Sequence, residues 1–213
     1  MSFPMEFSKK SKGLKYIMAR KIIPEKVEEA KEKIISATMD VIIEDGFFKL
    51  TLANAARKAG ITKAAIYWYF PGKDELIGAM AFSLRETFIG GVKQLVALPI
   101  PPKQKIEMLF DELEKNDVIK KCYLLTKLFI ELNAAGDEAT AILQAGQTEY
   151  IGLIQKIFDE AIAAGQIKST LSSESLAKIL VAMTNGCIIY NQTLPDQCVD
   201  FKDVKVFLMS IIE

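Results

Sequence analysis

Thr62, Lys63 and Ala64 begin a short helical segment, and their residue types suit contact with the bases of DNA. Thr62 is a good helix N-cap, and the segment must end before Pro71 because proline disfavours helical geometry in the residue before it. When such a helix enters the major groove, its N-terminal residues reach the base edges first. Lys63 is the single long donor of the three, so we expect it to read a base.

A second short helix must lie directly before this segment to position it. Thr51 can cap that helix, and Gly60 can end it because glycine adopts positive φ without steric cost. Its apolar positions are Leu52, Ala55, Ala56 and Ala59. Two short helices joined by a short turn that contains glycine describe a helix-turn-helix. Spacing alone would also fit any other pair of helices, so the residue identities must decide between these readings.

The stretch from Thr51 to Leu76 resembles the signature of the tetracycline-repressor (TetR) family of bacterial and archaeal transcription regulators. The matching pieces are Thr51, Ala59-Gly60-Ile61-Thr62, Tyr67-Trp68-Tyr69-Phe70 and Lys73-Asp74-Glu75-Leu76. The chain departs from the family at Ala55, where a larger aliphatic residue is usual, and at Tyr69, where histidine is common. The resemblance implies phosphate contacts by Thr51, Tyr67, Tyr69 and Lys73, with Arg57 as an addition. Trp68 fits either the interior of the head or the DNA backbone.

Apolar residues recur at helical spacing throughout the chain, which predicts an all-α protein of about nine helices, the number that the resemblance implies. We expect helices over 25–45, 52–59, 63–70, 74–98, 104–115, 117–135, 137–164, 173–192 and 200–212. The predicted division is a basic extension (1–24), a three-helix DNA-binding head (25–75) and a ligand-binding and dimerisation body (76–213). Gly90 and Gly91 interrupt the long helix, which either bends there or is crossed closely by another helix. Of these two, we favour close packing.

The body is rich in methionine and aromatic side chains, which adapt to apolar ligands. The resemblance implies that the body encloses a ligand cavity, and the candidate lining residues are Met80, Phe88, Met108, Phe110, Tyr123, Phe129, Tyr150 and Met183. We expect a small, largely apolar effector and no cofactor. A metal ion is not expected, because the chain has no histidine.

The resemblance also implies that the last two helices pair with those of a second copy. A two-fold homodimer would read a palindromic operator on double-stranded DNA. The apolar residues Leu176, Leu180, Met183, Phe207, Leu208 and Ile211 fit either the core of one copy or the interface between two. The implied function is that of a ligand-responsive repressor that is released from its operator by the effector.

Charge is unevenly distributed, although the whole chain has a net charge of zero. Residues 1–78 hold 14 lysines and arginines against 10 acidic residues, whereas residues 79–213 hold 13 against 17. This asymmetry has the sign expected of a DNA-facing head on an acidic body. The basic extension fits either a solvated tail or an arm that adds to DNA binding.

The cysteines and the uncharged runs limit which classes of protein this chain could belong to. Three cysteines without C-x-x-C spacing argue against a disulfide framework or a zinc site and favour the reducing cytoplasm. The start of the chain does not read as a signal peptide, and the longest uncharged run, 179–195, is too short and too polar to span a membrane. Two alternatives stay open: a redox regulator that uses Cys122, Cys187 or Cys198, and an all-α enzyme. No catalytic residue is assigned.

Overall fold

The computed structural model describes residues 24–133, 138–210 and 212 of the 213-residue chain. The predicted basic extension therefore lies outside the described residues, apart from Pro24. The described part is all-α, as predicted, and contains nine α-helices and no strand. The helices are α2 (Pro24–Asp45), α3 (Leu52–Ala59), α4 (Lys63–Tyr69), α5 (Lys73–Ala97), α6 (Pro102–Glu112), α7 (Asn116–Asn133), α8 (Glu138–Ala163), α9 (Ser173–Thr193) and α10 (Phe201–Ser210).

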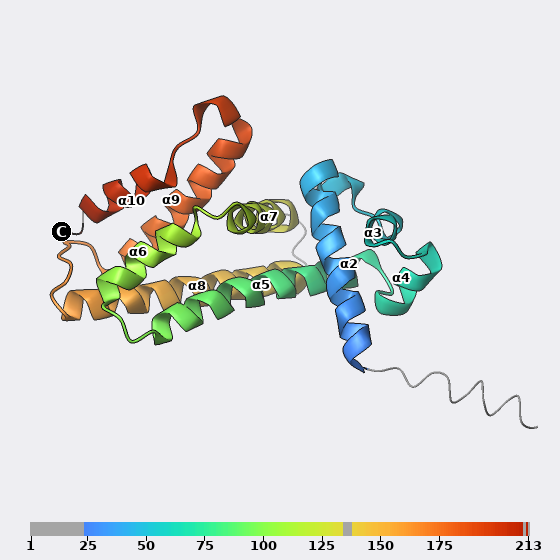
Figure 1. The fold of residues 1–213 in the computed structure, drawn as a ribbon, viewed down its shortest axis with the longest axis horizontal. Helices are drawn as coiled ribbons and strands as arrows, with labels where there is room; N and C mark the ends of the chain where they lie inside the picture. Colours follow the sequence, from blue (N-terminus) through green and yellow to red (C-terminus); the bar gives the residue numbers. More distant parts are fainter. Residues whose placement is uncertain (1–23, 134–137, 211, 213) are drawn as a thin grey trace, which may run out of the picture.

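Helices α2, α3 and α4 form the head at one end of the molecule (Figure 1). The hydroxyl of Thr51 accepts the N–H of Asn54 at 3.1 Å and so caps α3. Gly60 ends α3 with φ 72°, in the left-handed region. Thr62 caps α4 in the same way, accepting the N–H of Ala65 at 3.1 Å. The predicted helix-turn-helix thus forms from these local interactions.

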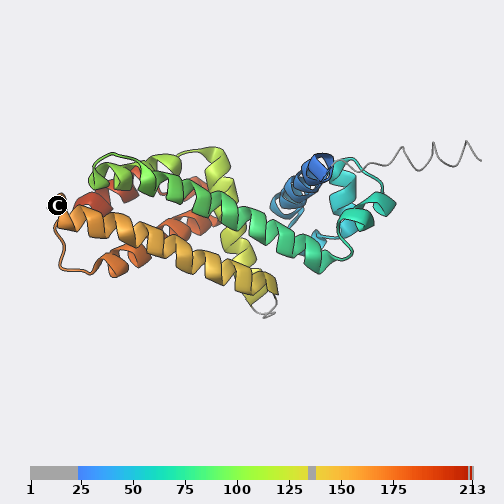
Figure 2. The same ribbon diagram turned by 90° about the horizontal axis from the view of Figure 1, so that it is seen from below.

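Helix α5 leaves the head and runs beside α8 through the body (Figures 1 and 2). The predicted close packing at Gly90 and Gly91 is wrong. Helix α5 passes unbroken through both residues, and no atom lies within 4 Å of a Cβ built at either. The close approach occurs instead at Gly146 of α8, where a Cβ would lie 2.9 Å from Cγ of Arg85 on α5.

Two clusters of buried apolar side chains hold the fold together. The head cluster contains residues of α2, α3, α4 and α5, and it also includes Leu124, Leu128 and Leu132 of α7 and Ala139 and Leu143 of α8. The body cluster is built from α5, α6, α8, α9 and α10, and half-buried residues such as Val118 and Cys122 of α7 pack against it. Helix α7 therefore contributes its C-terminal half to the head and its N-terminal half to the body.

No helix in the described ranges combines the length and the apolar character that a membrane span requires.

Candidate functional site

The first turn of α4 lies on the surface of the head. Ile66 and Phe70 point inward and are buried in the head cluster. Thr62, Lys63 and Ala64, which we predicted to reach bases, are all exposed at the start of the helix. The hydroxyl of Thr62 accepts a backbone N–H, which leaves its proton free to donate to a ligand.

The residues predicted to contact phosphate belong to α3 and its cap, to α4 itself and to the first residue of α5. Thr51 and Arg57 are exposed, and Tyr67 keeps 49% of its surface in solvent. Tyr69 and Lys73 are half-buried, and Nζ of Lys73 lies 5.0 Å from the centre of the Phe47 ring. Such a contact orients the ammonium group and still leaves its hydrogen-bond donors available.

Trp68, which the sequence left undecided, is on the surface with 57% of its area exposed. Its ring lies edge-on to that of Tyr69, with 4.8 Å between the ring centres.

The two basic residues at the end of α3 differ in their ion pairs. Nζ of Lys58 is paired with Glu44 at 2.6 Å, whereas Arg57 makes no ion pair within the described part of the chain. Arg57 is therefore the cation of α3 that can bind an added anion.

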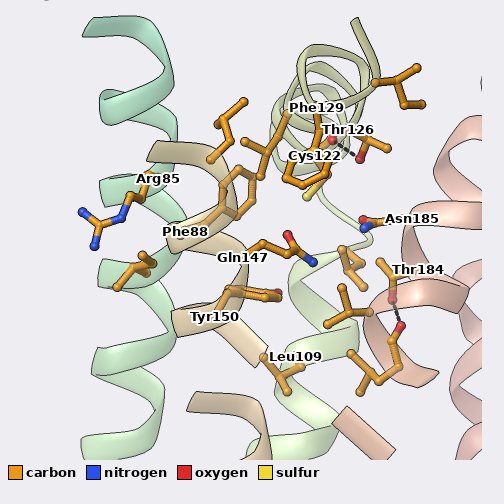
Figure 3. A pocket seen from close by; sticks show the side chains of 18 of the residues that line it. Arg85, Phe88, Leu109, Cys122, Thr126, Phe129, Gln147, Tyr150, Thr184 and Asn185 are labelled. Atoms are coloured by element: carbon orange, nitrogen blue, oxygen red, sulfur yellow. Dashed lines mark hydrogen bonds between the residues drawn. The ribbon is translucent and has the colours of Figure 1, made fainter. Parts of the chain in front are cut away.

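The body contains a cavity of about 200 Å³ that is bounded by α5, α6, α7, α8 and α9 (Figure 3). Four of the eight residues predicted to bind a ligand line it: Phe88, Phe110, Phe129 and Tyr150. The other four lie elsewhere. Met108 lines an adjoining cavity, Tyr123 and Met183 pack half-buried against the body cluster, and Met80 is fully buried in the head cluster.

The adjoining cavity, of about 420 Å³, lies between α5, α6, α7 and α8. Five residues belong to the walls of both cavities: Phe88, Leu109, Leu113, Cys122 and Tyr150. A molecule too long for the first cavity would therefore extend past these side chains into the second one.

Three neutral polar side chains point into the first cavity: Gln147, Tyr150 and Asn185 (Figure 3). None of them makes a side-chain hydrogen bond with the described residues. Two further polar side chains in the wall are already engaged. The hydroxyl of Thr126 donates to the carbonyl of Cys122 at 2.8 Å, and that of Thr184 donates to the carbonyl of Leu180 at 2.8 Å.

Arg85 is the one charged residue among the described residues that line this cavity. Its guanidinium group points away from the interior (Figure 3) and donates to Glu149 at 2.6 Å and to Glu86 at 2.7 Å. Its buried Nε–H has no partner in the described part of the chain. Glu149 is also paired with Lys93 at 2.7 Å, and hydrogen bonds from Lys93 and Arg85 lower the pKa of this carboxyl group.

The comparisons with known proteins agree with this geometry. The sequence profile of the bacterial regulatory proteins of the tetR family matches residues 34–80, which include α3, α4 and the start of α5. This segment of the chain thus matches the tetR family of bacterial regulatory proteins. The chain's match to the HTH-type transcriptional regulator SrpR of Pseudomonas putida is 44% identical over 66 residues, which is 31% of this chain and 30% of SrpR. The chain thus aligns with less than a third of that relative's length.

Two solved structures of transcription regulators share the fold over most of this chain. The regulatory protein TetR from Rhodobacter sphaeroides matches 86% of this chain and 99% of its own, with a TM-score of 0.75 and 18% identity. The regulator FadR from Bacillus subtilis, solved in complex with stearoyl-CoA, matches 85% of this chain and 99% of its own, with a TM-score of 0.64 and 22% identity. At these identities the likeness establishes the fold of the body.

The thiols lie in three environments. Cys122 lines both cavities, and burial raises the pKa of its thiol to about 12. Burial also raises the pKa of Cys187, whereas Cys198 is exposed. Since the thiolate is the reactive form, Cys122 is a poor nucleophile in the folded protein. Within the described residues, no group of three or more Cys, Asp and Glu side chains could hold a metal ion.

Gln147 and Asn185 are cavity residues that our sequence analysis missed. Gln147 lies four residues after Leu143 and three before Tyr150, so it falls on the apolar face of α8. Thr184 and Asn185 interrupt the apolar face of α9 in the same way. A neutral polar residue within an apolar helical stripe was the available signal.

Proposed function

We propose that this chain is a ligand-responsive transcription regulator, and that it represses by binding a palindromic operator in double-stranded DNA as a homodimer. A small, largely apolar effector would release it. The observation that carries the proposal is the exposed first turn of α4 on a head whose apolar cluster extends through α7 to the wall of an internal cavity. Because its target is DNA, we place the protein in the cytoplasm.

The surface of the head supports DNA binding in two ways. Lys63 and Ala64 stand at the N-terminus of an exposed helix, where side chains reach base edges. Helices α3, α4 and α5 and the cap of α3 carry hydroxyl and cationic donors that keep access to solvent, and such groups bind phosphate oxygens: Thr51, Arg57, Tyr67, Tyr69 and Lys73. Lys63 would therefore read sequence, while these phosphate-binding residues would fix the register and supply most of the affinity.

The end of the body supports a dimer. Leu176, Leu180 and Leu208 are buried in the body cluster of a single copy, so they are core residues. On α10, by contrast, Val206 and Phe207 are 68% and 54% exposed, and Tyr190 on α9 is also exposed. Exposed apolar side chains on neighbouring helices suit an isologous interface. Ile211, the remaining candidate, lies outside the described residues.

Two helices can carry the signal from the cavity to the head. Phe88 and Arg85 of α5 line the cavity, and Leu76 at the other end of the same helix is buried in the head cluster. Helix α7 presents Leu125 and Phe129 to the cavity, while Leu124, Leu128 and Leu132 are buried against the head. A ligand that displaces either helix would therefore change the position of the head and the spacing of the two recognition helices.

A redox mechanism has less support. A sensor cysteine must form a thiolate, and burial disfavours that form at Cys122. FadR, which was solved in complex with stearoyl-CoA, instead supports ligand binding by a protein of this fold.

The proposal is tested by selecting bound DNA from a random pool and then measuring effector affinity with and without the selected DNA. We expect a palindromic consensus. Coupling of about 1–3 kcal/mol would weaken DNA binding roughly 5- to 150-fold, and DNA must weaken effector binding by the same factor. If the selection enriched no sequence, the DNA-binding role would be overturned. If the effector bound equally well with and without DNA, the regulatory role would be overturned.

A further inference from the structure

We infer that the 200 Å³ cavity selects an electrically neutral, planar aromatic molecule that carries one group able both to donate and to accept hydrogen bonds, such as a primary amide. This inference rests on the proposed function, because it names the chemical class of the effector. It goes beyond a largely apolar ligand by excluding acids and amines of the same size and shape.

The exclusion of charged ligands follows from the charges around the cavity. Arg85 is the charged residue among its described lining residues, and its guanidinium is paired outside the cavity with Glu149 and Glu86. Lys93 also pairs with Glu149, so the two cations and two anions cancel. The Nε–H of Arg85 has no partner among the described residues, so it offers a hydrogen-bond donor at the cavity wall without adding a net charge there. The titratable groups that face the interior, Cys122 and Tyr150, are a thiol and a phenol, which are protonated at neutral pH, and burial raises the pKa of both further. An ionic ligand would lose its hydration and find no counter-ion.

The requirement for a donor and acceptor follows from the polar groups that face inward. Gln147 and Asn185 each hold an amide N–H₂ and an amide oxygen in the cavity, and neither is hydrogen-bonded to a described residue. Thr126 and Thr184 have used their hydroxyl protons on helix carbonyls, so their oxygens can only accept. A neutral group with both capacities can satisfy these partners at once.

The planar shape follows from the aromatic walls. Phe88 of α5, Phe129 of α7 and Tyr150 of α8 approach the cavity from three helices (Figure 3). Aromatic side chains favour stacked or edge-on contact with another ring.

The test compares three probes that share one naphthalene ring system and differ in charge. The probes are 2-naphthamide (neutral), 2-naphthoate (anion) and 2-naphthamidine (cation), whose substituents are similar in size and planar. Their affinities for the full chain are measured by calorimetry at pH 7.5 without DNA. We expect the amide to bind at least about tenfold more tightly than either ion. An ion that binds as tightly as the amide would overturn the inference, and so would the absence of amide binding.

Substitutions at Gln147 locate the binding. Gln147→Leu should weaken binding of 2-naphthamide about three- to tenfold, because it removes a hydrogen-bond partner of the amide group. Gln147→Glu should reverse the preference in favour of 2-naphthamidine by adding an anion. Gln155→Leu is the matched control, because Gln155 lies on the same helix and outside both cavities, and it should change nothing. If Gln147→Glu left the order of the probes unchanged, the inference would be wrong.

The probe experiment tests the ligand class and the DNA experiment tests the regulatory function, so either conclusion can be overturned without the other. Amide binding in this pattern without any effect on DNA affinity would leave the ligand class standing and overturn the regulatory function. Amide binding that tracks the substitutions and also weakens DNA binding would support both.

Discussion

Arg85 and Glu149 join α5 to α8 through a hydrogen-bonded ion pair of 2.6 Å at the edge of the cavity. The aliphatic part of Arg85 lies against Gly146, one turn before Glu149 on α8. The absence of a side chain at residue 146 therefore makes room for the arginine that connects the two long helices.

Replacing Gly146 by alanine tests this relationship. The added Cβ would lie 2.9 Å from Cγ and 3.1 Å from Cδ of Arg85, so either the arginine or the helix must move. We expect Gly146→Ala to lower the free energy of unfolding by about 1–3 kcal/mol. The control is Gly152→Ala on the same helix, where no atom lies within 4 Å, and it should stabilise by up to about 1 kcal/mol. Chemical denaturation measures both, and equal effects would contradict the close packing.

Lys63→Ala and Lys73→Ala should alter DNA binding differently. Lys63 is exposed at the start of α4, so its loss should relax base preference by about 1–3 kcal/mol at one position per half-site. Lys73 lies over Phe47 at the start of α5, where we expect a phosphate contact, so its loss should weaken all sequences alike and flatten the salt dependence. The measurement is affinity for a set of operator variants at several salt concentrations. The same specificity profile for both variants would disprove this division.

The apolar surface of α10 should mediate dimerisation. Phe207→Glu places a charge where we expect a second copy, and it should shift the protein toward monomer in sedimentation or light-scattering measurements. Phe82→Glu is the matched control, since Phe82 on α5 is 53% exposed against 54% for Phe207. It should leave the oligomeric state unchanged. A dimer that tolerates Phe207→Glu would remove α10 from the interface.

The cysteines should react with a thiol reagent at very different rates. With a pKa of about 12, roughly one Cys122 thiol in ten thousand is ionised at pH 8. Cys198 is exposed and should react first. Titration of the native protein should therefore show a fast phase that Cys198→Ser removes and Cys122→Ala preserves. A fast phase that disappears with Cys122→Ala would revive the redox alternative.

The buried thiol should also destabilise the fold at alkaline pH. The pKa of Cys122 is raised from 9.0 to about 12, so below pH 9 the thiol is protonated in both the folded and the unfolded chain. Between pH 9 and 12 the unfolded chain ionises first, and the free energy of unfolding therefore falls as pH rises. Burial of Tyr150 acts in the same direction. Urea unfolding between pH 8 and 10.5 should show a shallower decline for Cys122→Ala than for wild type or Cys198→Ala. If wild type and Cys122→Ala lost stability at the same rate with pH, the raised pKa of Cys122 would be contradicted.

Local interactions explain why much of the head could be predicted from sequence. Thr51 and Thr62 cap helices with their own side chains, and Gly60 alone supplies the left-handed turn between them. Each of these interactions spans only a few residues, so its result can be read from the chain. The alternation of apolar residues at steps of three and four predicted the nine helices for the same reason.

The cavity, in contrast, depends on how distant helices pack. Met80 and Phe88 lie two turns apart on α5 and both contact the head cluster, yet Met80 is fully buried whereas Phe88 is half-buried and lines the cavity. Gly90 and Gly91 suggested close packing from sequence, but it is Gly146 that contacts Arg85. The sequence by itself determined which residues form helices and which side of each helix is apolar. Only the tertiary structure decided which apolar surfaces fill a core and which line a cavity, because that choice depends on the relative positions of five helices whose lining residues run from Arg85 to Asn185.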